Sequence, residues 1–145
     1  MTRLGQWMGA IALVGLAAGG ATAQERKLIP PIRGEAPLDI TKPATRVVGN
    51  EVITTFVVRN PATTGAIAGL KVEENWYDKG GNPVGGGIYR HARPLMPDEV
   101  IRVELKTPKS PKMNTNQYQF THANGTVKVT TVAKLDAPKP PPTTK

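Results

Sequence analysis

The feature that most constrains the fold is an alternation of apolar and polar residues that recurs along the chain with a period of two. It is clearest where Ile101, Val103 and Leu105 alternate with charged residues at 102, 104 and 106. Successive side chains of a β-strand point to opposite faces, so this pattern predicts a strand with one buried face. Six other segments are strand candidates: 45–48, 52–58, 70–76, 83–90, 118–122 and 126–132.

Turn-forming residues separate these segments. The stretch 78–82 contains two glycines. The candidate strand 83–90 contains three more, Gly85 to Gly87, which suggest a bulge or an edge strand. Asn124-Gly125 lies between two alternating runs and predicts a hairpin with a type I′ turn, which needs positive φ at both central positions.

Seven strand candidates, with no helical period after the N-terminal segment, predict an all-β fold. The leading arrangement is an antiparallel immunoglobulin-like β-sandwich of about seven strands, and an open barrel is the alternative. Glu74 falls on the apolar side of its strand and interrupts the pattern there. The expected core consists of large apolar side chains at inward-facing positions: Ile53, Phe56, Val58, Leu70, Val72, Trp76, Ile101, Val103, Leu105, Tyr118, Phe120, Val127 and Val129.

The N-terminal residues have the pattern of a signal peptide. Arg3 precedes an uncharged stretch from Trp7 to Ala18. The segment ends with the small residues Ala21-Thr22-Ala23. A positive start, an apolar middle of about a dozen residues and an A-x-A end are typical of secretory signals. Such a stretch is too short for a bilayer-spanning helix, which needs roughly 20 apolar residues. We expect cleavage after Ala23 and a periplasmic or secreted mature protein.

Composition sets the expected boundaries. Residues 1–23 are the signal peptide, 24–44 a proline-containing linker or edge strand, 45–135 the β-sandwich domain, and 136–145 a disordered tail rich in proline and lysine. The chain has no cysteine, so no disulfide can support its core. No second apolar stretch is long enough to cross a membrane, and we expect no stable membrane insertion after cleavage.

The sequence is basic, with 19 Lys and Arg against 11 Asp and Glu and a net charge of +8. Cleavage would remove Arg3 and leave 18 against 11, or +7. Such a balance favours a partner that is an anionic envelope component or a protein. We expect no nucleic acid partner, because basic runs interleaved with aromatic residues are lacking. The most compact basic cluster, Arg90, His91 and Arg93, is the candidate contact for an anionic ligand.

The sequence offers little for catalysis. Without cysteine there is no thiol nucleophile, and no glycine-rich phosphate motif or nucleophile elbow is present. The adjacent carboxylates at 73–74 and 98–99 would face opposite sides of a strand. We therefore expect no enzyme, no cofactor and no metal. A periplasmic metal-handling or hydrolytic protein using His91 and His122 is the alternative.

Three short motifs lie between Val52 and Val103: Arg59-Asn60 at a strand end, Trp76-Tyr77-Asp78 before a glycine turn, and the loop Leu95-Met96-Pro97-Asp98-Glu99. Together they resemble the FxLYD domain family, an exported bacterial immunoglobulin-like β-sandwich of unassigned function. Glu74 and Asp98 stand where that family has Phe and Gly. The resemblance implies structural roles for four motif residues: Trp76, Tyr77, Asp78 and Pro97. Asp78 can cap the backbone of its turn.

These patterns favour a non-catalytic, exported β-sandwich module that acts as a binding or accessory protein of the cell envelope. Besides the metal-handling or hydrolytic alternative, a third possibility is a structural subunit of a surface assembly. In that case the proline-rich segments at the two ends of the domain would act as connectors.

Overall fold

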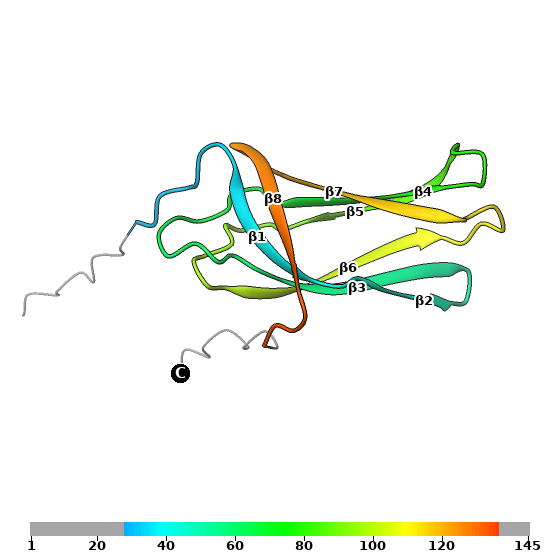
Figure 1. The fold of residues 1–145 in the computed structure, drawn as a ribbon, viewed down its shortest axis with the longest axis horizontal. Coiled ribbons are helices and arrows are strands. Elements are labelled where there is room, and N and C mark those ends of the chain that lie inside the picture. Colours follow the sequence, from blue (N-terminus) through cyan, green and yellow to red (C-terminus); the bar gives the residue numbers. More distant parts are fainter. Residues whose placement is uncertain (1–27, 137–145) are drawn as a thin grey trace, which may run out of the picture.

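Residues 28–136 form an all-β fold of eight strands (Figure 1). The structure is a computed structural model that describes residues 28–136, and this range contains no helix, and so none that could cross a membrane. The predicted signal peptide and all of the predicted tail except Asp136 lie outside the described residues. The strands in chain order are β1 (Ala36–Thr41), β2 (Ala44–Val48), β3 (Glu51–Arg59), β4 (Lys71–Tyr77), β5 (Pro83–Arg90), β6 (Val100–Pro108), β7 (Thr115–His122) and β8 (Gly125–Val132).

The sheet is mixed and strongly curled, which corrects the prediction of a purely antiparallel fold. Its strand order is β2-β3-β1-β8-β7-β4-β5, and β6 also pairs with β3. Most neighbours are antiparallel, but β1 and β8 run parallel from the pair Ala36–Val127 to the pair Thr41–Val132. The N-terminal strand thus enters the fold alongside the last strand and in the same direction, which the alternation within either strand cannot reveal.

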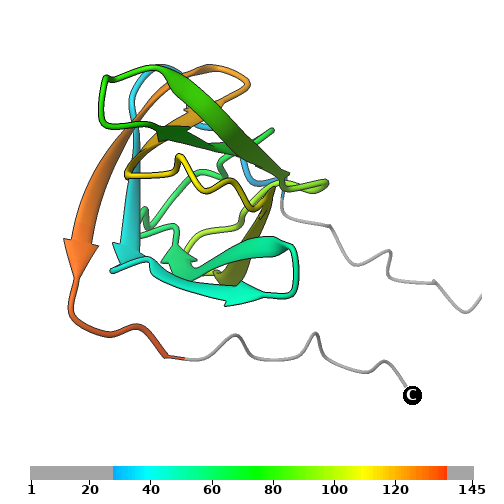
Figure 2. The ribbon, with the colours of Figure 1, turned by 90° about the vertical axis from the view of Figure 1, so that its right-hand side faces the viewer.

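The curled sheet forms two layers (Figure 1). β3 and β6 pair along their whole lengths and form the lower layer with β2. β4 pairs with β5 on one side and with β7 on the other to form the upper layer. β8 links the layers, because its first residues pair with β7 and the following ones pair with β1. The end-on view shows β1 and β8 closing one side between the layers (Figure 2).

The core lies between the layers. Inward-facing side chains such as Phe56, Val72 and Val103 are buried, as their alternation predicted. The loop residues Ile67 and Leu95 are fully buried as well, although they belong to no alternating run. Five residues expected in the core are only partly buried: Trp76, Tyr118, Phe120, Val127 and Val129. Trp76 lies near the end of β4, and the other four lie on β7 and β8.

The segment 24–44, expected to be a linker or an edge strand, contains β1, which is neither. β1 pairs with β3 on one side and with β8 on the other. Its side chains Ala36, Leu38 and Ile40 are buried in the core. This alternation was present in the sequence but was obscured by prolines within and beside it, which weaken any strand prediction.

The β7–β8 hairpin forms where expected, but its turn differs from the predicted type I′. His122 pairs with Gly125, so the two turn residues are Ala123 and Asn124. Asn124 does not have positive φ, and Gly125 has a φ of 155°. A Cβ at Gly125 would lie 2.2 Å from the carbonyl oxygen of Gly34, so the glycine is needed for the close approach of the N-terminal segment.

Candidate functional site

The end of β5 and the loop after it carry the residues predicted to contact an anionic ligand. Arg93 forms an ion pair with one carboxylate oxygen of Glu99, and the other oxygen accepts the N–H of Met96 at 2.8 Å. Within residues 28–136, Arg90 has no ion-pair partner. Glu99 therefore offsets part of the positive charge that the sequence placed in this loop.

His91 contributes no fixed positive charge to this loop. Its Nδ1 lies 3.0 Å from the hydroxyl of Tyr89, and the two rings stack with their centroids 6.2 Å apart. Burial lowers the pKa of His91, which favours the neutral ring, and burial also raises the pKa of Tyr89. When Nδ1 accepts the hydroxyl proton, the ring proton lies on Nε2, which is buried without a partner among the described residues.

His122 binds the N-terminal segment. Its Nε2 lies 2.6 Å from the carbonyl oxygen of Gly34, and the N–H of Asn124 lies 3.4 Å from its Nδ1. A carbonyl only accepts and an amide N–H only donates, so these contacts assign the ring proton to Nε2. In the part of the chain that the structure describes, no group of three or more His, Asp or Glu side chains is placed to hold a metal ion. Each histidine has its own structural partner.

The motif residues after β4 hold the β4–β5 turn. Oδ1 of Asp78 accepts the N–H groups of Gly80 and Asn82, both at 2.9 Å, which is the capping role expected of it. The N–H of Asn82 contributes most to holding the pKa of Asp78 below its usual value. The carbonyl of Tyr77 accepts the N–H of Asn114 at 2.9 Å and ties the β6–β7 loop to the end of β4.

Pro97 and Asp98 lie in the loop before β6. Asp98 has a φ of 61°, and no other non-glycine residue in the described range has positive φ. This is the position at which the FxLYD family has glycine, the residue that adopts positive φ most easily. Aspartate tolerates this conformation better than most residues, but it does so at some cost. Asp98 therefore holds a left-handed backbone conformation in this loop.

A buried carboxylate is the most unusual chemical feature of the core. Glu74 is 1% exposed and has no ion-pair partner in the described range. Its Oε2 accepts from the Thr54 hydroxyl at 2.7 Å and from Asn116 Nδ2 at 3.2 Å. Its Oε1 accepts from Trp76 Nε1 at 2.9 Å and from the Thr107 hydroxyl at 3.4 Å. We name these five residues the Glu74 cluster.

Strand pairing brings the Glu74 cluster together from both layers. Thr54 and Thr107 come from β3 and β6 of the lower layer, and the other three members come from β4 and β7 of the upper layer. Four neutral donors satisfy the carboxylate oxygens, which is how a single charge can remain in a core. Burial, and then the charge of Glu74, raise the pKa of the neighbouring Tyr118 to about 12.

The glycines of β5 allow the layers to close over this cluster. A Cβ at Gly87 would lie 2.9 Å from the carbonyl oxygen of Lys106, and one at Gly85 would lie 3.2 Å from Cγ2 of Thr107. The β4–β5 pairing also has a register shift between Trp76 and Tyr77. The prediction of a bulge or an edge strand is therefore met on both counts: the pairing of β5 with β4 is irregular, and β5 ends the strand order. The glycines of β5 also pack closely against β6.

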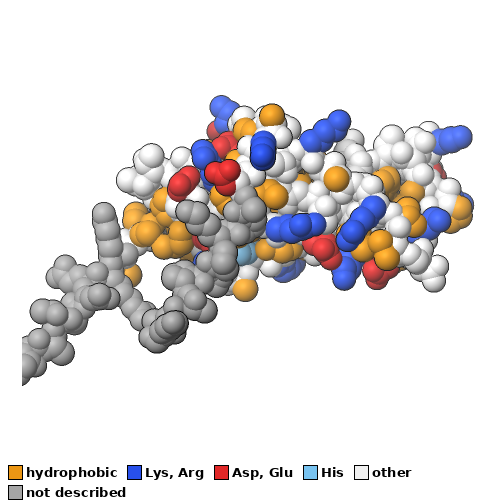
Figure 3. All heavy atoms as spheres, turned by 90° about the horizontal axis from the view of Figure 1, so that it is seen from below, with side chains coloured by type: hydrophobic (Ala, Val, Ile, Leu, Met, Phe, Trp, Pro, Cys, Tyr) orange, Lys and Arg blue, Asp and Glu red, His pale blue; other side chains and the backbone are white. Residues whose placement is uncertain are grey.

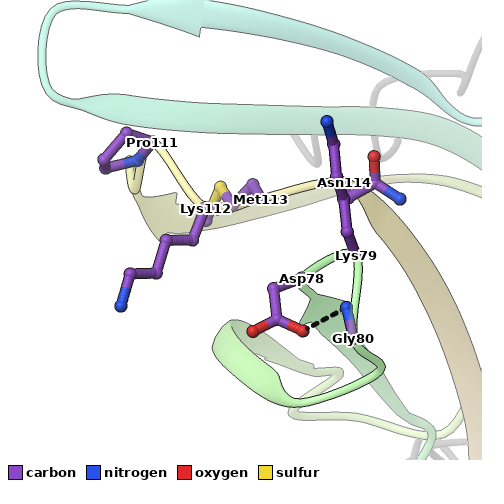
Figure 4. Close-up of a pocket in the computed structure, with 7 residues that line it drawn as sticks. All are labelled: Asp78, Lys79, Gly80, Pro111, Lys112, Met113 and Asn114. Carbon is purple, nitrogen blue, oxygen red and sulfur yellow. Dashed lines mark hydrogen bonds between the residues drawn. The ribbon is translucent and has the colours of Figure 1, made fainter.

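A cleft of about 290 Å³ lies between the β4–β5 turn and the β6–β7 loop (Figure 4). In this view the side chains of Lys79 and Lys112 extend in different directions, and Asp78 faces Gly80. The two ammonium groups therefore do not converge on one point, and the carboxylate of Asp78 is already engaged in the turn. The cleft has a mixed lining without a convergent set of polar groups.

Comparison of the chain with models of protein families, with curated proteins and with solved structures finds no match. The resemblance to the FxLYD family therefore stays a prediction that rests on its short motifs. Function has to be inferred from the geometry of the chain itself.

The sequence interpretation missed the Glu74 cluster, but it contained a signal for it. Glu74 was noted as a charge on the apolar side of its strand. Thr54 and Thr107 also fall on the inward side of their own strands, so three strands carry a polar residue at an inward position. Such coinciding exceptions indicate a shared hydrogen-bond network, because a buried polar group needs a partner.

Proposed function

We propose that the protein is a non-catalytic binding or accessory module of the cell envelope. One observation carries this proposal: the groups capable of acid–base chemistry in the core are committed to structural hydrogen bonds. Glu74 is held by four donors, and His122 and His91 have their own partners. Groups used in this way stabilise a scaffold and leave recognition to the surface.

The pairing of the strands supports an immunoglobulin-like arrangement for this module. In that fold strand B pairs with strands A and E, and strand F pairs with strands C and G. Here β3 pairs with β1 and β6, and β7 pairs with β4 and β8. β5 extends the upper layer beside β4, as an added strand does in the variable type. Such sandwiches commonly present loops and edges to partners.

Export is supported by the signal-like N-terminus, and it is tested directly by sequencing the N-terminus of protein recovered from cell fractions. The proposal expects the mature chain to begin at Gln24 and to be found in the periplasmic or extracellular fraction. An unprocessed chain in the cytoplasm would contradict the envelope location.

The binding function is tested by cross-linking the tagged protein in intact cells that carry it naturally, and then identifying what co-purifies under denaturing conditions. The proposal expects the same envelope component in independent preparations. Failure to recover any component reproducibly would contradict it. Stoichiometric metal in the purified protein, lost in a His91→Ala/His122→Ala variant, would favour the metal-handling alternative instead.

A further inference from the structure

The lower layer is incomplete beside β2. β8 pairs with β1 as far as the pair Thr41–Val132. β2 follows β1 along the same edge of β3 and runs in the same direction, because both strands are antiparallel to β3. Among the described strands, none pairs with the other edge of β2. No strand within residues 28–136 therefore fills, beside Ala44–Val48, the position that β8 fills beside β1, and we name this edge the open edge of β2.

Backbone groups of β2 point towards the open edge. A two-residue turn joins β2 to β3, and its first residue, Gly49, has the φ of 59° that suits a type II′ turn. Along an antiparallel pair of strands, residue pairs that exchange backbone hydrogen bonds alternate with pairs that do not. The pair Val48–Glu51, which closes the turn, is the first hydrogen-bonded pair, so the pairs of Val47 and Thr45 are not hydrogen-bonded. The N–H and C=O groups of Thr45 and Val47 are therefore directed away from β3. They can donate to and accept from an added strand.

The side chains of β2 are equally accessible. All five residues are exposed, and Val47 and Val48 are 56% and 50% exposed. Successive residues of a strand point to opposite faces, so these two valines lie on opposite faces of the sheet. A strand added at the open edge of β2 would cover apolar surface on both faces.

The charges beside the open edge select the kind of strand. The segment 42–48 contains Lys42 and Arg46 and no acidic residue. Neither of these cations has an ion-pair partner within residues 28–136. Figure 3 looks onto the lower layer from below and shows Lys and Arg side chains interspersed with acidic ones. Arg46 lies in one cross-strand row with Ile53 and Lys106, and the ammonium of Lys106 pairs with Glu104 at 3.6 Å, so Arg46 is the cation of this row that keeps its charge for an added strand. Cross-strand neighbours of opposite charge stabilise a sheet, so this edge favours an acidic strand and disfavours a basic one.

We propose that the open edge of β2 binds an extended polypeptide segment in which acidic and β-branched residues alternate. The inference rests on the proposed binding function and names its site. Acidic residues would lie on the face of Arg46, and β-branched residues on the face of Val47. Backbone bonds to Thr45 and Val47 supply affinity, while Arg46 supplies the preference for acidic strands. A second copy of β2 fits less well, because it contains Arg46 and no acid.

The test uses two synthetic peptides of nine residues, one alternating glutamate with valine and one alternating lysine with valine, titrated into the isotope-labelled protein. We expect the acidic peptide to shift the backbone amide signals of residues 44–48 and the basic peptide to leave them unchanged. Arg46→Glu should reverse this preference by at least tenfold in the dissociation constants. Val47→Pro should weaken the acidic peptide at least tenfold with the other strands unperturbed, because it removes an N–H that faces the open edge. Arg33→Glu, the matched control, makes the same charge reversal at an exposed residue outside the strands and should change neither affinity.

Several outcomes would overturn the assignment: no binding of either peptide at millimolar concentration, signal shifts centred on other strands, or an unchanged preference in Arg46→Glu. Concentration-dependent dimerisation that Val47→Pro abolishes would show that β2 pairs with itself instead. The binding function is judged separately by cross-linking in cells. An envelope component recovered equally well by Val47→Pro and the unchanged protein would refute the β2 site and leave the proposed function standing.

Discussion

Replacing Glu74 with alanine should destabilise the fold strongly. Thr54 and Thr107 are fully buried, so their hydroxyls cannot replace the lost bonds with water. Each buried polar group left without a partner costs about 1–3 kcal/mol, which applies in full to Thr107 and only in part to Thr54, because the Thr54 hydroxyl keeps its contact with the Thr45 hydroxyl at 3.3 Å. Trp76 and Asn116 are half-buried and can reach solvent. Removing a desolvated carboxylate offsets part of the loss, so we expect a net loss of about 2 kcal/mol in the free energy of unfolding.

Glutamine at the same position separates the charge from the hydrogen bonds. The indole N–H of Trp76 can only donate, so the amide oxygen of Glu74→Gln must face it. The amide NH₂ then faces Thr54, whose hydroxyl can accept, and Asn116, whose amide can turn to present its oxygen. Most bonds of the cluster can therefore form again, and we expect Glu74→Gln to lose only about 1 kcal/mol.

Urea denaturation of the purified variants measures both losses, and the titration of Tyr118 supplies an independent reading. The pKa of Tyr118 is about 12, raised first by burial and then by the charge of Glu74. In Glu74→Gln that pKa should fall but remain above the usual value of 10.0, because burial persists. The absorbance of the tyrosinate follows this titration.

The matched control is Glu73→Ala, which removes the neighbouring carboxylate on the opposite face of β4. Glu73 is partly exposed and pairs with Lys71 at 3.3 Å. Pairs of this kind contribute about 0–1 kcal/mol, so the control should lose little stability. The reasoning is refuted if Glu74→Ala loses no more than Glu73→Ala, or if glutamine destabilises as much as alanine.

Asp98→Gly should increase the free energy of unfolding by up to about 1 kcal/mol, because it relieves a left-handed backbone, whereas Asp98→Ala should not; equal denaturation midpoints for both would contradict this. Gly125→Ala should cost at least about 2 kcal/mol through its clash with Gly34, and Gly81→Ala about 1 kcal/mol, because a Cβ at Gly81 meets nothing within 4 Å. Similar losses for the two glycines in urea denaturation would speak against the steric account. The free energy of unfolding should fall as the pH drops below 6.5, the ordinary pKa of histidine. The loss should continue until the pH reaches the lowered pKa of His91 in the folded protein, because in this range the unfolded chain binds the proton more readily. This loss should disappear in His91→Gln, and an NMR titration that places the pKa of the His91 ring at or above 6.5 would disprove it.

Most strands were predictable because a half-buried strand imposes alternation on its own residues. β6 is the clearest case, since its inward residues Ile101, Val103 and Leu105 are buried and the residues between them are exposed. β1 follows the same rule, but it is short and interrupted by proline. Its parallel pairing with β8 joins residues such as Leu38 and Val129, which are far apart in the chain, and no local pattern specifies that choice.

The candidate site was predictable only in part. The basic cluster at 90–93 was visible in the sequence, but the ion pair between Arg93 and Glu99 depends on how the loop folds back. Glu74, Thr54 and Thr107 were each visible as polar residues at inward positions, but the alternation does not show that they meet. Thr54, Thr107 and Asn116 lie 20, 33 and 42 positions away from it along the chain.

Alternation along the chain was enough to predict an all-β domain over residues 45–135, the positions of most of its strands, and the apolar side of each strand. The folded structure was needed to show that the sheet is mixed, that Glu74 accepts hydrogen bonds from both layers, and that no other strand within residues 28–136 pairs with the outer edge of β2. The difference lies in how far apart along the chain the interacting residues are. Alternation follows from which face of a strand meets water, whereas strand partners, buried hydrogen bonds and ion pairs depend on residues that only folding brings together.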